Sequence, residues 1–96
     1  MSNLDEILEI EEIRWREMPF SEIAATLGDV TCYEKNHKGS EYQFEIHTKN
    51  GKSDNEIITM VECSKKSFFG TFFGKCRYFA KSNDESIREI DGDEAF

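Results

Sequence analysis

The spacing of apolar residues changes period near residue 29, and this change constrains the fold more than any other feature. Before it, Leu4, Ile7, Leu8, Trp15 and Met18 fall within one arc when successive residues are placed 100° apart, as in an amphipathic helix. After it, apolar and polar residues alternate in short runs, as in half-buried strands. This order predicts an α+β fold in which N-terminal helices pack on an antiparallel sheet.

Three residues depart from the apolar stripe of the first helix. Ile10 and Ile13 lie off the arc, and Glu11 lies within it. We therefore expect the helix to be covered on two sides or to contact a partner. Pro19 disfavours the helical conformation at Met18, so the helix should end there.

A second short helix is predicted from Ser21, as its N-cap, to Gly28. These eight residues resemble the first helix of many helix-turn-helix units. A helix-turn-helix unit needs its recognition helix directly after this segment. The residues found there, Asp29–Tyr33, are mostly β-branched or aromatic and favour a strand. The resemblance therefore does not predict DNA binding.

The rest of the chain is predicted to form four or five strands in meander order, because short connections make sequential strands neighbours. A glycine-bearing hairpin loop is expected over 36–40. The last segment, 86–90, is interpreted as an edge strand, with one helical turn as the alternative. The whole chain, 1–96, is expected to be one domain. Its predicted parts are a helical segment (1–28), the sheet (29–90, with strands near 30–35, 42–47, 56–64, 75–81 and 86–90) and a loose acidic tail (91–96).

Charge is distributed unevenly along the chain. Residues 1–28 and 84–96 each carry a net charge of −5, whereas 29–83 carry +2. Within the middle part, 63–83 hold five bases, six aromatic rings and no acid. Single-stranded nucleic acid surfaces combine these residue types. In the alternative interpretation, the rings belong to the core and the bases pair with the acidic helix. A chain at −8 also repels a polyanion, so nucleic acid binding is the second hypothesis.

Paired phenylalanines separated by glycines over 68–74 fit neither a regular strand nor a helix, so we expect a bulged strand or a loop. Rings left exposed there would form an apolar patch typical of binding surfaces. We therefore predict a non-enzymatic protein-binding or regulatory module, with an unidentified protein partner or self-association as a dimer. A small ligand between helix and sheet is the third hypothesis. The predicted binding residues are Phe68, Phe69, Phe72, Phe73, Lys75, Arg77 and Phe79.

No catalytic, cofactor-binding or metal-binding arrangement is predicted. His37 is expected in the hairpin loop and His47 on the solvated face of its strand. Cys32, Cys63 and Cys76 would give a zinc site with His47 the right ligand count, but the chain has no Cys-x-x-Cys pair. All three cysteines occupy apolar positions of the predicted strands and are expected to pack there.

An odd number of cysteines argues against a secreted disulfide framework, and no signal peptide or membrane-length apolar run is present, so a cytoplasmic location is expected.

Overall fold

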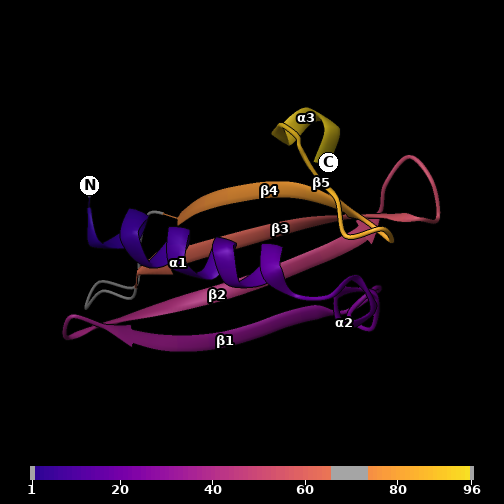
Figure 1. The fold of residues 1–96 in the computed structure, drawn as a ribbon. Coiled ribbons are helices and arrows are strands. Elements are labelled where there is room, and N and C mark those ends of the chain that lie inside the picture. Colours follow the sequence, from indigo (N-terminus) through magenta and orange to yellow (C-terminus); the bar gives the residue numbers. More distant parts are fainter. Residues whose placement is uncertain (1, 66–73, 96) are drawn as a thin grey trace.

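The structure is a computed structural model that describes residues 2–65 and 74–95. An N-terminal helix lies across an antiparallel sheet, so the predicted α+β class is confirmed (Figure 1). The helices of the described residues are α1 (Asn3–Glu17), α2 (Phe20–Ala24) and α3 (Gly92–Ala95). The strands are β1 (Val30–His37), β2 (Ser40–Asn50), β3 (Glu56–Lys65), β4 (Gly74–Ser82) and β5 (Ile87–Glu89).

α1 ends at the predicted position. Met18 has an extended backbone with ψ 134° and closes the helix before Pro19. At the other end, the Ser2 Oγ accepts a hydrogen bond of 3.1 Å from the Asp5 N–H and caps the first turn. The predicted apolar stripe faces the sheet. The side chains that it buries are Ile7, Leu8, Glu11 and Trp15.

α2 begins one residue before the predicted N-cap. Its N-cap is Pro19, so the prediction of Ser21 is wrong. The Phe20 N–H, which has no acceptor inside the helix, donates to the two carboxylate oxygens of Glu85 at 3.1 and 3.0 Å. Because Glu85 follows β4, 65 residues away, local sequence did not indicate this acceptor. α2 ends at Ala24, so the prediction that Gly28 closes the helix is wrong; Gly28, at φ +86°, lies in the turn that follows α2.

The sheet is the predicted meander. Its order within the described residues is β1-β2-β3-β4-β5, and each neighbouring pair is antiparallel. β1 continues to His37, beyond the predicted end near residue 35, because the following turn needs only Lys38 and Gly39. These two residues have φ values of 52° and 84°, as in a two-residue hairpin turn. β5 confirms the interpretation of segment 86–90 as a strand.

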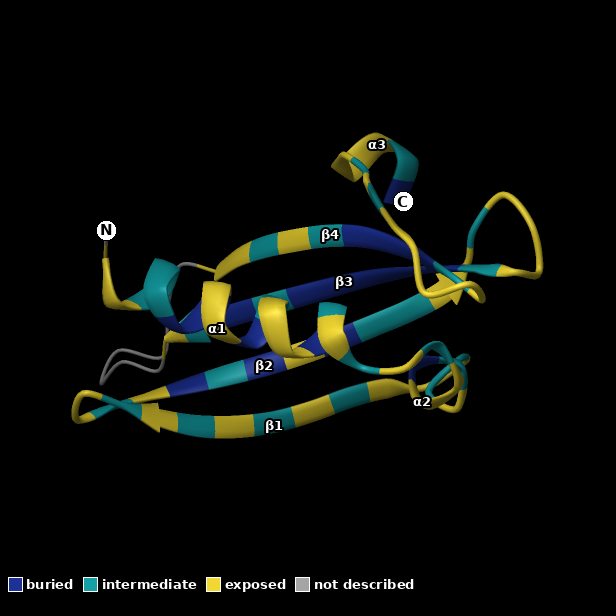
Figure 2. Ribbon diagram, viewed as in Figure 1, coloured by how far each residue is buried: buried dark blue, intermediate teal, exposed yellow. Residues whose placement is uncertain are grey.

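The main core lies between α1 and one face of the sheet, which we call the helix face. Phe44 lies opposite Cys63 and Ile46 lies opposite Val61 in the β2–β3 pair, and all four side chains are buried. The central strand β3 is dark blue along most of its length in Figure 2, because its helix-face residues from Ile57 to Cys63 are buried, as are Ile58 and Met60 on the opposite face. This burial agrees with its largely apolar sequence.

The opposite face of the sheet, which we call the open face, is covered at one end by α3. Ala95 is buried against Ile58 and Ala80. The prediction of a loose tail over 91–96 is therefore wrong for Gly92–Ala95, while Phe96 lies outside the described residues. The tail is held by the apolar contact of one small side chain, Ala95, and nothing in the acidic terminal sequence indicated this contact.

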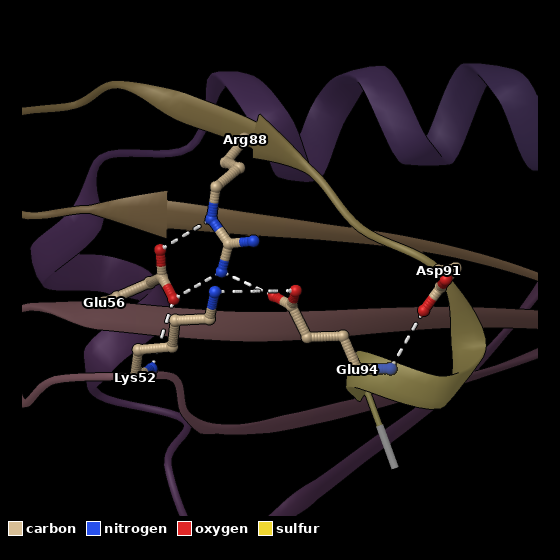
Figure 3. A network of polar contacts seen from close by, with 5 residues as sticks. All are labelled: Lys52, Glu56, Arg88, Asp91 and Glu94. Carbon is tan, nitrogen blue, oxygen red and sulfur yellow. Dashed lines mark hydrogen bonds and ion pairs between the residues drawn. The ribbon is translucent and has the colours of Figure 1, made fainter.

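Ionic contacts reinforce the position of α3. Arg88 in β5 donates to the carboxylate of Glu56 at 3.2 and 2.9 Å and forms an ion pair with Glu94 (Figure 3). The Asp91 carboxylate accepts a hydrogen bond of 2.9 Å from the Glu94 N–H and caps the short helix. A base from the sheet thus binds acids from two separate segments.

Candidate functional site

The structure separates the predicted binding residues. Phe79 is fully buried on the helix face, with the guanidinium carbon of Arg16 5.2 Å from its ring centre. Its predicted role in binding is therefore wrong, because the register places it opposite Thr59 of the central strand and beneath α1. Lys75 and Arg77 are exposed at the start of β4. The remaining predicted residues, Phe68, Phe69, Phe72 and Phe73, lie outside the described residues.

Two bases bind acids of α1, and one of them, Lys75, belongs to the basic stretch 63–83, so the alternative interpretation of the charge pattern is confirmed for this residue. Lys75 Nζ lies 2.8 Å from the Asp5 carboxylate, and Lys38 Nζ lies 3.0 Å from that of Glu6. Glu6 is also 2.9 Å from Nε2 of His37, which lies at the end of β1 rather than in the hairpin loop. Hydrogen bonds from Lys38 and then His37 lower the pKa of Glu6.

Lys81 has a structural role. Its ammonium group is buried on the helix face and donates to the carbonyl oxygens of Arg16 and Met18, each at 2.7 Å. These carbonyls lie at the C-terminus of α1, where the helix dipole favours a positive charge. Phe79 and Lys81 are therefore not accessible to a nucleic acid strand.

The cysteines lie on different faces of the sheet. Cys63 is buried on the helix face, as predicted, and burial with the nearby charge of Glu11 raises its pKa to about 12. Cys32 is exposed and Cys76 half-buried on the open face, so the expectation of apolar packing is wrong for Cys32. α1 covers only the helix face, so the residues of β1 that point to the open face, Cys32 among them, lie in solvent. A zinc site that uses all three thiols does not form.

The outer side of α1 carries two exposed apolar side chains. Ile10 and Ile13 are 51% and 47% exposed and lie one helical turn apart on the same side. Exposed positions of α1 appear as yellow bands in Figure 2. The two isoleucines border a shallow depression of about 450 Å³. We call its lining residues the α1 patch, which consists of Ile10, Ile13, Arg14, Glu17, Met18 and Glu22.

Carboxylates surround the α1 patch without ion-pair partners among the described residues. Glu17 and Glu22 belong to the patch, Glu9 precedes it, and all three are exposed. By contrast, the carboxylates of Glu11 and Glu12 bind bases of the protein. Within residues 2–65 and 74–95, the acids on the outer side therefore present negative charge that no base offsets.

A buried network beneath the patch holds α1 on the sheet. The Trp15 indole N–H donates to the Tyr33 hydroxyl at 3.0 Å, and that hydroxyl donates to the Glu11 carboxylate at 2.9 Å. Glu11 also forms ion pairs with Lys35 and Arg14. Burial alone would raise the pKa of Glu11, but the hydrogen bonds from Lys35 and Tyr33 outweigh it and lower the pKa. The patch thus rests on a fixed helix.

The sequence indicated part of this site. Ile10 and Ile13 were singled out because they lie off the apolar stripe, and the structure leaves them uncovered by the rest of the described chain. Glu11 was singled out for the opposite reason, and besides the nearby Arg14 its partners are Tyr33 and Lys35 of β1. Because the two partners on β1 depend on strand pairing and helix placement, no local pattern indicated them.

Comparison of the chain with models of known protein families, with curated proteins and with solved structures found no match. No helix in the described parts of the chain has the length and apolar character needed to cross a membrane.

Proposed function

We propose that this chain is a non-enzymatic protein-binding module whose α1 patch binds a basic partner protein. The observation that carries the proposal is the exposure of Ile10 and Ile13 on a helix that the buried Glu11 network holds in place. About half of each isoleucine stays exposed, and burial of this remaining surface by a partner would contribute about 1 kcal/mol each.

Charge selects the kind of partner. The acids Glu9, Glu17 and Glu22 frame the isoleucines and lack bases of their own among the described residues. A second copy of the chain would bring two such acidic surfaces together, and a nucleic acid would add further negative charge. A partner protein with an apolar surface surrounded by lysine or arginine would match both the isoleucines and the carboxylates of the patch.

The aromatic segment remains a second part of the proposal. Phe68, Phe69, Phe72 and Phe73 lie outside the described residues, so the α1 patch carries the argument. Lys75 already binds Asp5, and Arg77 is exposed beside it on β4. We place the module in the cytoplasm, where the exposed Cys32 thiol would stay reduced.

Site-specific cross-linking tests the proposal. A photo-activated amino acid at position 13 is compared in host cells with the same group at position 34, which lies on the open face. We expect a discrete adduct to a basic protein from position 13 and none from position 34. The identified partner is then purified, and its affinity for the unmodified chain is measured by titration calorimetry.

A matched pair of variants decides whether the patch carries the binding. The change Ile10→Ser with Ile13→Ser should weaken the purified complex about thirtyfold, from about 2 kcal/mol of lost apolar burial. The change Val30→Ser with Ile87→Ser removes two other exposed apolar side chains, 52% and 39% accessible, and should leave the affinity unchanged. An adduct of two copies of the chain, no adduct, or equal losses in both double variants would refute the proposal.

A further inference from the structure

The open face of the sheet brings three side chains with metal-binding atoms together. Glu45 and His47 alternate with the buried residues of β2 and therefore share this face. Glu62 lies directly opposite Glu45 in β3. One donor atom of each residue lies within 4.8 Å of the others. The side chains of Glu45 and His47 are 50% and 32% exposed, so an ion from solvent reaches them.

The two carboxylates of this group have no compensating base among residues 2–65 and 74–95. Like charges directly opposite each other on neighbouring strands repel. Neither Glu45 nor Glu62 has a lysine or arginine partner in the described part of the chain, in contrast to Glu56 and Glu94, which share one arginine. Nε2 of His47 lies 3.8 Å from Glu45 Oε2, too far for a hydrogen bond. A cation between the three side chains would remove the repulsion.

We propose that Glu45, His47 and Glu62 bind one divalent transition-metal ion, with Zn²⁺ as the best-matched ion. Two carboxylate oxygens and one imidazole nitrogen are ligands that zinc accepts, with solvent completing the coordination. Calcium and magnesium prefer oxygen ligands alone, so the histidine selects against them.

The backbone already holds the ligands in place. Glu45 and Glu62 lie within the continuous antiparallel pairing of β2 and β3, two inner strands of the sheet. Zinc bonds of about 2.0–2.2 Å place two tetrahedral ligands about 3.4 Å apart, so donor atoms that lie within 4.8 Å of one another must close by at most about 1.4 Å. Rotation of the glutamate side chains supplies this movement, and the strands keep their positions.

Two thiols flank the site and are the competing ligands. Cys32 lies opposite Glu45 on β1, and Cys76 lies opposite Glu62 on β4. Zinc prefers thiolate strongly, so a test on the unmodified chain would not separate the two sets of ligands. The experiment therefore uses a chain with Cys32→Ser and Cys76→Ser, in which the proposed ligands are intact.

Zinc titration of this chain, followed by calorimetry, is the direct test. We expect one zinc ion per chain. Adding Glu62→Gln should weaken the affinity at least about tenfold, because a ligand loses its charge. Glu41→Gln is the matched control, since it removes the same charge from the same face of β2, four residues from Glu45, and should leave the affinity unchanged.

Proton NMR of the two histidines supplies a second readout with an internal control. The imidazole signals of His47 should shift on addition of zinc, whereas those of His37, which binds Glu6 on the helix face, should not. Circular dichroism of each variant establishes that it is folded before titration. Loss of zinc binding in the serine chain, equal affinities of the Glu62→Gln and Glu41→Gln variants, or a shift at His37 alone would overturn the proposal.

Discussion

The Glu11 carboxylate is buried between α1 and the sheet, where it pairs with Lys35 and Arg14 and accepts a hydrogen bond from the Tyr33 hydroxyl. At the scale of one residue, Glu11→Gln keeps the size of the side chain but removes the charge that these donors bind. We expect the free energy of unfolding to fall by about 1–3 kcal/mol, measured by urea denaturation at pH 7. Glu9→Gln, at an exposed position of the same helix with no ion-pair partner among the described residues, should change it by less than about 0.5 kcal/mol. Equal effects of the two changes would show that the buried network does not stabilise the fold.

At the scale of an element, the C-terminus of α1 depends on Lys81 of β4. Its ammonium donates to the Arg16 and Met18 carbonyls, and Lys81→Met leaves both acceptors without this donor. We expect a loss of about 1.5–3 kcal/mol in unfolding free energy. Amide hydrogen exchange should become faster in the last turn of α1 and stay unchanged in its first turn. Lys65→Met, at an exposed position of β3, is the control, and the same exchange pattern in both variants would contradict this role.

At the scale of the whole molecule, ion pairs that join distant segments make stability depend on pH. Hydrogen bonds from Arg88 lower the pKa of Glu56 and Glu94 from the ordinary value of 4.5. A lowered carboxyl pKa contributes stability above pH 4.5, and this contribution is lost as the pH falls through the folded-state pKa. Urea midpoints measured between about pH 7 and pH 3 should therefore fall steadily below about pH 4. Arg88→Gln should make this fall shallower, whereas Arg77→Gln should leave it unchanged. If the urea midpoints of the unmodified chain and both variants fell in parallel with pH, the ion pairs of Arg88 would not be the cause.

The sequence alone determined the class of fold and most of the elements. The change of apolar period near residue 29, the proline after Met18 and the short connections predicted a helix followed by an antiparallel meander. Each of these signals acts between residues that are close in the chain, so it can be read without coordinates. The off-stripe positions of Ile10 and Ile13 were visible for the same reason.

The tertiary structure decided which side chains are buried and which meet. Phe79 and Lys81 belong to a basic and aromatic stretch, yet both lie beneath α1 because of the register of β4. The Phe20 N–H finds its acceptor 65 residues away. Likewise, Glu45 and Glu62 become neighbours only when β2 pairs with β3. Such contacts depend on strand register and on the face that α1 covers, and these are properties of the assembled chain rather than of any local pattern.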